Sequence, residues 1–113
     1  MKSKISSLSK SDDFKNLLSG RKISNPYSVI FFKKISYKNN KLLNVSFVTK
    51  KKIGNAVKRN KIKRRLRNIM NDALKSININ LNYSYLFIAK KNIYDANYKM
   101  IKESIFKDLT KVR

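Results

Sequence analysis

The stretch KKKIGNAVKRNKIKRRLRNIMN, residues 50–71, organises the rest of the chain. Its lone glycine, Gly54, marks the change from a strand to a helix that we expect to run from Asn55 to Ile77. At 100° per residue, the apolar side chains of this segment fall on one continuous face. These side chains are Ile62, Leu66, Ile69, Met70, Ala73, Leu74 and Ile77. The pattern predicts an amphipathic helix with one buried face, and the remaining faces are strongly basic.

Arg59 is the exception in this pattern, because its azimuth is close to that of Leu66. A buried arginine without a partner would be strongly destabilising. We therefore expect the helix to extend beyond its packing partner at the N-terminal end, so that Arg59 and Asn60 lie on an accessible rim. Helix N-termini also favour phosphate, since free backbone N–H groups and the helix dipole point there.

The composition indicates an anionic partner. The chain has 113 residues, with 28 Lys and Arg against 6 Asp and Glu, and a formal net charge of +22. A folded domain with this charge repels itself, and an extended polyanion relieves the repulsion, so nucleic acid is the first candidate. An anionic membrane surface is the alternative, but the sequence has no apolar run of ~18 residues and no signal peptide. We expect a cytoplasmic protein that does not bind membranes.

The side chains of a self-contained active site are missing from the sequence. Without histidine or cysteine there is no imidazole base, thiolate nucleophile or common zinc site. The six acids are scattered without a paired-carboxylate spacing; they are Asp12, Asp13, Asp72, Asp95, Glu103 and Asp108. We expect no metal site formed by the protein alone. If the chain belongs to an enzyme, a partner performs the chemistry.

Around the basic helix, the sequence predicts one domain preceded by a short arm. Residues 1–10 are basic and serine-rich without a helical or strand period, so we expect a flexible arm there. The domain covers residues 11–113 and begins with a short amphipathic helix over 11–20. It ends in a third amphipathic helix, which reaches about residue 111.

Three further segments have the composition of strands. Residues 27–36 and 42–49 are rich in aromatic and β-branched side chains, and the turn at Lys38–Lys41 predicts that they form an antiparallel hairpin. Residues 83–90 are nearly continuous in apolar side chains, which is typical of a central strand covered on both faces. The alternation in the second strand places four side chains on one face: Leu43, Val45, Phe47 and Thr49.

The run from Lys51 to Arg67 resembles the signature helix of the bacterial ribonuclease P protein subunit, nearly without interruption. Ser11–Phe14 is similar to the first helix of that family, and Tyr85–Lys91 is similar to its last strand. One position departs from the family pattern, which usually has Arg-Asn-Arg at the centre of the motif. Here Lys61 takes the last of these places, and a point charge replaces a planar bidentate fork.

The order helix, two strands, basic helix, strand, helix predicts an α+β fold, an α/β sandwich with a mixed sheet. The resemblance adds a short fourth strand, which would lie near Arg21–Ser24. It also implies an unusual left-handed βαβ crossover, whereas most such crossovers are right-handed. We therefore expect the order αβ(ββ)αβα and a mixed four-stranded sheet.

The resemblance implies a protein cofactor of a ribozyme. In the family, the catalytic RNA removes the 5′ leader of precursor tRNA with Mg²⁺ held mainly by the RNA, and the protein raises the affinity for substrate and metal. We therefore expect a subunit of an endoribonuclease whose catalytic groups belong to the RNA. Its partners would be ribonuclease P RNA, with one protein per RNA, and precursor tRNA.

The resemblance also implies two sets of RNA-binding residues. Arginine forks suit phosphate oxygens, and the signature helix faces the catalytic RNA; the residues expected to bind it are Lys51, Lys52, Asn55, Arg59, Asn60, Lys61, Lys63, Arg64 and Arg67. Bases of single strands stack on aromatic rings, and a cleft between the sheet and the first helix takes the leader. The residues expected to bind the leader are Phe14, Leu18, Phe31 and Phe47. The family often has an aromatic residue at the position of Leu18, so stacking should be weaker there. For each aromatic, core packing is the alternative role.

Three other functions remain as alternatives. A small ribosomal or general RNA-binding protein fits the size and charge, and only the signature run argues against it. A DNA-binding helix used in transcription needs a dimer or a preceding helix, and no helix directly precedes Asn55. A self-contained nuclease lacks the necessary side chains.

Overall fold

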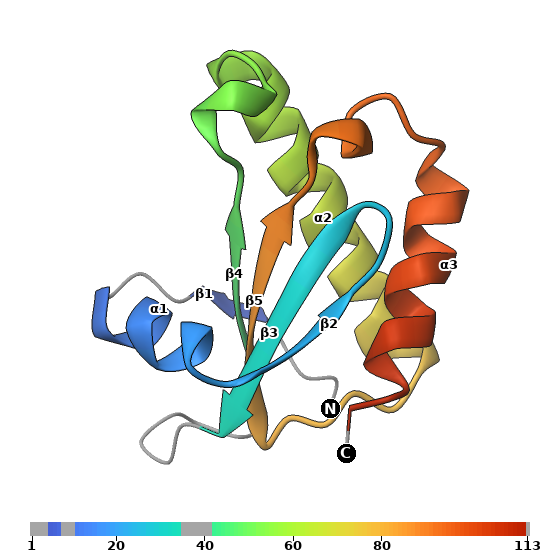
Figure 1. Ribbon diagram of the computed structural model, residues 1–113. Coiled ribbons are helices and arrows are strands. Elements are labelled where there is room, and N and C mark those ends of the chain that lie inside the picture. Colours follow the sequence, from blue (N-terminus) through green and yellow to red (C-terminus); the bar gives the residue numbers. More distant parts are fainter. Residues whose placement is uncertain (1–4, 8–10, 35–41, 113) are drawn as a thin grey trace.

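The computed structural model describes residues 5–7, 11–34 and 42–112, which form a mixed five-stranded sheet with helices on both faces (Figure 1). The strands are β1 (Ile5–Ser7), β2 (Arg21–Ser24), β3 (Ser28–Lys34), β4 (Leu43–Val48) and β5 (Tyr83–Ala89). The helices are α1 (Ser11–Leu18), α2 (Ala56–Ser76) and α3 (Tyr98–Leu109), with short 3₁₀ turns η1 (Lys51–Ile53) and η2 (Lys91–Ile93). The prediction of an α+β fold is therefore confirmed.

The strand β5 lies at the centre of the sheet, whose order is β1-β4-β5-β3-β2. It pairs in parallel with β4 and antiparallel with β3. Ser84, Tyr85, Leu86 and Phe87 are all buried, so β5 is covered on both faces. The prediction of a central, doubly covered strand at residues 83–90 is confirmed.

The predicted hairpin between β3 and β4 is wrong. These two strands are not neighbours, because β5 lies between them. The predicted turn at Lys38–Lys41 lies outside the described residues. The short strand expected near Arg21–Ser24 is present as β2, and β3 forms its hairpin with this strand instead, in the register Arg21↔Phe32 to Ser24↔Val29. The central place between β3 and β4 is instead taken by β5, which is buried on both of its apolar faces.

The sheet has one strand more than predicted. Ile5–Ser7 falls in the segment expected to be a flexible arm, and it pairs in parallel with β4 from Ile5↔Leu43 to Ser7↔Val45. Ile5 packs against the main core, and this contact explains why so short a strand is held at the edge of the sheet.

The helix α2 buries the face that its sequence predicts. Its buried side chains are Ile62, Leu66, Ile69, Met70 and Ala73, and Leu74 and Ile77 pack half-buried against the same core. This core also receives alternate residues of β3, β4 and β5 and one face of α3. The connection β4-α2-β5 joins parallel neighbours as a βαβ unit. A left-handed crossover there stays a prediction.

A second, smaller core lies on the opposite face of the sheet. Leu17 of α1 and Leu86 of β5 are buried in it, and the half-buried side chains around them are Phe14, Phe31, Val48 and Ile88. Since α1 covers only part of this face (Figure 1), part of the sheet surface beside α1 stays accessible.

Candidate nucleic-acid interface

The basic helix α2 begins where Asn55 caps it. The Asn55 side chain accepts a hydrogen bond from the backbone N–H of Lys58 at 3.0 Å, which satisfies one of the free donors of the first turn. Lys51 and Lys52 lie exposed in η1 just before this cap. Cations and free N–H groups therefore gather at the same end of α2.

The basic side chains of α2 form two groups, one on each side of the helix. One flank faces β4, where Asn60, Lys63, Arg64 and Arg67 line a cavity of about 370 Å³. We call this cavity the β4–α2 pocket; Val45, Ser46 and Phe47 of β4 complete its lining. Among the described residues of the lining there is no Asp or Glu, so none of them neutralises the charges of its cations.

The other flank of α2 lies against Tyr94, which follows η2. The Nζ atoms of Lys58 and Lys61 lie 5.0 and 5.7 Å from the centre of the Tyr94 ring. The Arg65 guanidinium donates a hydrogen bond to the Tyr94 carbonyl at 3.2 Å. Lys61 is therefore separated from the pocket residues, although the sequence places it beside Asn60 in the motif. Nothing in the linear pattern connected Tyr94 with the basic helix.

Arg59 matches its sequence-based prediction only in part. Asn60 is exposed, as an accessible rim requires, whereas Arg59 is half-buried. Its Nε atom is buried without a hydrogen-bond partner among the described residues. Arg59 therefore points partly toward the core, as its position on the helix predicts, and only part of its side chain is accessible at the helix end.

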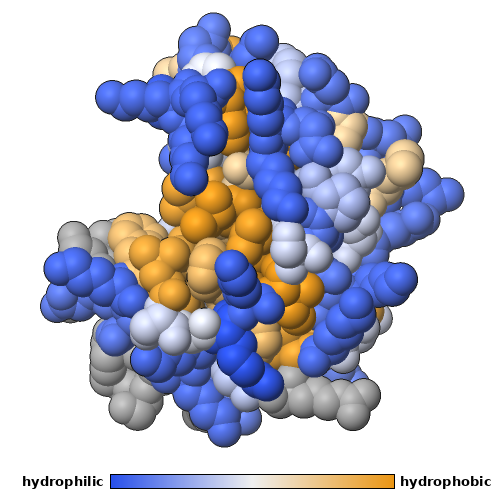
Figure 2. Space-filling view, in the orientation of Figure 1, coloured by the Kyte–Doolittle hydropathy of each residue, from blue (hydrophilic) through white to orange (hydrophobic). Residues whose placement is uncertain are grey.

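The accessible sheet surface beside α1 forms a cleft with an apolar floor and a basic rim. Figure 2 shows this hydrophobic surface hollowed between hydrophilic side chains. At one end of the cleft is a cavity of about 460 Å³. Its floor includes Val29 and Ile88, and the cations of its lining are Lys50, Lys52, Lys90 and Lys91. We call the whole surface the α1 cleft.

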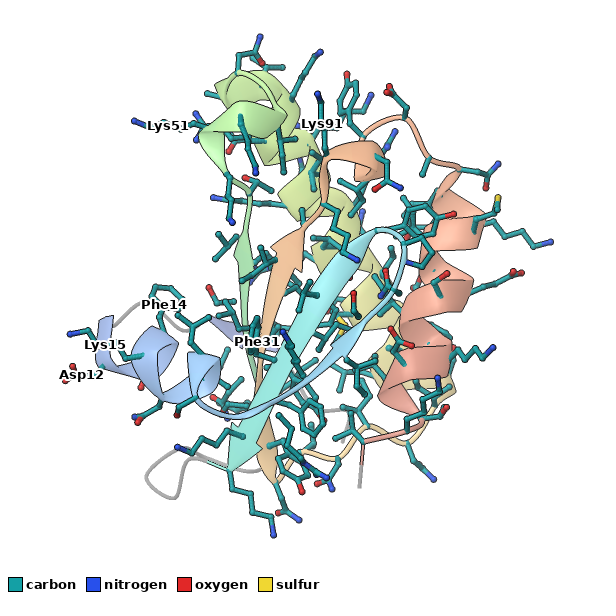
Figure 3. The ribbon with its side chains drawn as sticks, in the orientation of Figure 1. Asp12, Phe14, Lys15, Phe31, Lys51 and Lys91 are labelled. Atoms are coloured by element: carbon teal, nitrogen blue, oxygen red, sulfur yellow. The ribbon has the colours of Figure 1, made fainter. Side chains whose placement is uncertain are left out.

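Two of the four predicted leader-binding residues meet in the α1 cleft. Phe14 of α1 and Phe31 of β3 belong to the same half-buried cluster, and Figure 3 shows them on facing elements, with Lys51 and Lys91 at the far end. Leu18 is one helical turn beyond Phe14 and is 51% exposed. Its packing on the sheet is slight, which leaves the side chain accessible to a ligand.

Phe47 is not brought together with the other predicted leader-binding residues. Side chains alternate along β4, so Phe47 shares the α2 face with Val45, as the sequence predicted. Its ring centre lies 5.6 Å from that of Phe87. Phe31, in contrast, belongs to the cluster on the α1 face. The sheet therefore separates Phe47 from Phe31.

Among the lysines of the cleft, Lys90 is held in place by the protein. Its Nζ atom donates to the Ser24 hydroxyl and to the Asn25 carbonyl, both at 2.7 Å. These contacts fix a positive charge where β5 ends, and Lys91 next to it is exposed. A fixed cation loses less conformational entropy on binding an anion than a free side chain does.

Two further features of the described residues bear on the chemistry. In these ranges no group of three or more His, Cys, Asp or Glu side chains could hold a metal ion. None of the helices in the described part of the chain is long and apolar enough to cross a membrane.

The comparisons with known proteins converge on one family. The family model described as Ribonuclease P matches residues 2–113. The chain is 31% identical to the ribonuclease P protein component of Caldanaerobacter subterraneus subsp. tengcongensis, covering 98% of this chain and 92% of that protein. It is 36% identical to that of Fusobacterium nucleatum subsp. nucleatum, covering 96% and 94%. The fold is similar to the structure of Staphylococcus aureus RNase P protein, with a TM-score of 0.77, 27% identity, and coverage of 93% and 92%.

Proposed function

The chain belongs to the bacterial ribonuclease P protein family, and on that premise we propose that it is the protein subunit of a ribonuclease P holoenzyme. In this role it binds the RNA subunit and helps it to remove the 5′ leader of precursor tRNA. The observation that carries the proposal is the pair of basic surfaces on opposite faces of one sheet, the α1 cleft and the β4–α2 pocket flank. A subunit that joins two RNA molecules needs two such surfaces.

The RNA subunit is assigned to the N-terminal half of α2 and to η1. Apart from Ala56 and Val57, the exposed side chains there are cations and asparagines, and the cap of α2 adds free backbone N–H groups. Guanidinium forks bind phosphate oxygens in bidentate geometry, which suits Arg64 and Arg67. Lys61 binds as a point charge on the Tyr94 flank.

The precursor tRNA leader is assigned to the α1 cleft. A single strand without a fixed sequence is held by aromatic platforms in a positively charged groove. Phe14 and Phe31 supply the rings, and the lysines around the cavity at the end of the cleft supply the charge. The leader therefore contacts this face, and Phe47 has no part in its binding.

Catalysis is assigned to the RNA subunit, with one protein per RNA. The described residues hold no cluster of three or more His, Cys, Asp or Glu side chains, and Mg²⁺ is commonly held through phosphate oxygens, which the RNA supplies. Mg²⁺ would supply a Lewis acid for hydrolysis of the phosphodiester from within the RNA. The protein contributes positive charge, which lowers the repulsion between the two RNA molecules. The site of action is the cytoplasm, where precursor tRNA is processed.

Reconstitution tests the proposal. Precursor tRNA is incubated with a bacterial ribonuclease P RNA at low Mg²⁺, with and without this chain. We expect strong stimulation of cleavage at the mature 5′ end and no cleavage by the protein alone. Tight RNA binding without stimulation would instead indicate a ribosomal or general RNA-binding protein.

A further inference from the structure

The position of Phe47 gives the β4–α2 pocket a chemical character that the rest of α2 lacks. The Phe47 ring is half-buried and packs on Phe87 at the surface of the main core. It also lines the pocket. The pocket therefore combines one aromatic surface with the donors of Asn60, Lys63, Arg64 and Arg67. On the opposite flank of α2, the ring of Tyr94 is already in contact with Lys58 and Lys61.

The four polar side chains that α2 contributes to the pocket, those of Asn60, Lys63, Arg64 and Arg67, are available to a ligand. Within the described residues, none of them makes a side-chain hydrogen bond or an ion pair. The two cations on the opposite flank, in contrast, contact Tyr94, and Arg65 donates to its carbonyl. Because the described lining residues include no acid, the pocket suits a ligand that carries both negative charge and a flat apolar surface.

The size of the pocket suits a single nucleotide rather than a nucleic-acid duplex. Its volume of about 370 Å³ is at the lower end of the range for pockets that enclose small molecules, roughly 300–1,000 Å³. Single-stranded loops and bulges of RNA can present one unstacked base to an aromatic side chain. A paired base stays inside its stack and cannot enter such a pocket.

We propose that the β4–α2 pocket binds one unstacked nucleotide of the ribonuclease P RNA. The base packs on the edge or face of Phe47, Arg64 and Arg67 hold the adjoining phosphate, and Asn60 donates to or accepts from the base. This inference rests on the proposed function, because it assigns the partner of the same helix. Contacts to phosphates alone do not distinguish one RNA segment from another. The pocket would add recognition of an unpaired nucleotide to this interface.

Photocrosslinking from the pocket tests this directly. The chain is prepared with p-benzoylphenylalanine at position 47 and, as a control, at position 106, where Phe106 packs against the same core from α3. Each protein is irradiated in the reconstituted holoenzyme with precursor tRNA present. We expect position 47 to crosslink to an unpaired nucleotide of the RNA subunit and position 106 to give no such product. A crosslink from position 47 to the tRNA leader or to a paired segment, or no crosslink, overturns the proposal.

A matched set of substitutions provides an independent measurement. Phe47→Leu keeps an apolar side chain but removes the ring, Phe47→Tyr keeps the ring, and Phe106→Leu is the control. We expect Phe47→Leu to weaken binding of the RNA subunit at least about fivefold, which corresponds to the smallest loss of affinity expected when one stacked base is lost. Phe47→Tyr and Phe106→Leu should bind within about twofold of wild type, a change far smaller than the loss of one stack. Thermal unfolding of each variant confirms that it is folded before its affinity is compared.

The outcomes separate this inference from the proposed function. If wild-type protein stimulates cleavage but Phe47→Leu binds the RNA subunit normally, the pocket does not take a base and only this inference fails. If wild-type protein neither binds the RNA nor stimulates cleavage, the proposed function fails and the inference fails with it.

Discussion

At the scale of single residues, side-chain alternation decides which RNA each aromatic ring can contact. Phe31 and Phe47 occupy neighbouring regions of one sheet, yet they face α1 and α2 respectively. The sequence predicted the alternation within β4 correctly. It could not show which face of β4 lies on the same side as α1, because that depends on how the strands are ordered in the sheet. Phe47 was therefore grouped with the wrong aromatic residues.

Tyr85 makes the stability of the fold sensitive to alkaline pH. It is fully buried and donates a hydrogen bond to the Asn80 carbonyl at 2.7 Å. Burial, with nearby Tyr83 as a smaller cause, raises the pKa of the Tyr85 phenol well above its ordinary value of 10.0. The unfolded chain loses this proton near the ordinary pKa, so the contribution of Tyr85 to stability is complete below pH 10 and falls above it.

The variant Tyr85→Phe isolates this effect. We expect the free energy of unfolding of wild type, minus that of Tyr85→Phe, to decrease between about pH 9 and pH 11. Below this range the difference should be constant, with wild type about 1 kcal/mol more stable because of the hydrogen bond to Asn80. Urea unfolding at each pH measures both values. A difference that does not change with pH would contradict a raised pKa for Tyr85.

Asp108 and Asn25 join the end of α3 to the turn between β2 and β3. The Asn25 amide donates to Asp108 at 2.9 Å and to the Ser28 hydroxyl at 3.1 Å, and its oxygen accepts from the backbone N–H of Tyr27 and Ser28. Both Asn25 and Asp108 are buried. Loss of a buried partner leaves a polar group without its hydrogen bond.

Replacement of Asp108 by Ala should therefore lower the free energy of unfolding by about 1–3 kcal/mol. The control is Glu103→Ala on the exposed surface of the same helix, which should change stability by less than about 0.5 kcal/mol. Chemical denaturation of the free protein measures both. Equal effects of the two substitutions would show that the contact to Asn25 does not hold α3 to the sheet.

At the scale of elements, α2 shows what local pattern can predict. Its buried face follows from residues within a few turns of each other, and the structure has this face where the periodicity predicts. The pairing of β3 with β4 was wrong because strand order depends on contacts between distant segments. The strand β1 was not predicted because a strand of three residues has too few positions to show alternation.

The β4 flank of α2 should dominate the salt dependence of binding to the RNA subunit. Each phosphate contact contributes about 0.7 to 0.9 to the slope of log K against log salt. We expect Arg64→Ala with Arg67→Ala to reduce the magnitude of this slope by about 1.4 to 1.8. The control pair is Lys75→Ala with Lys107→Ala, two exposed cations in the last turns of α2 and α3. An unchanged slope for the arginine pair would remove this flank from the RNA interface.

At the scale of the whole molecule, one sheet separates two basic surfaces. The α1 cleft and the β4–α2 pocket lie on opposite faces. The composition predicted a polyanionic partner but not two separate surfaces, because net charge contains no information about direction. The division depends on β5, whose two apolar faces allow α1 and α2 to pack on opposite sides.

The measurement that tests this division most directly compares two RNA affinities in two variants, Phe31→Ala and Arg64→Ala with Arg67→Ala. The first affinity is that of the protein for the RNA subunit alone. The second is the ratio of holoenzyme affinities for precursor tRNA with and without its leader, at saturating protein. We predict that Phe31→Ala lowers only the leader ratio, by at least about fivefold. The arginine variant should weaken only RNA-subunit binding. If both variants lower both affinities to the same extent, the two faces do not bind separate RNA molecules.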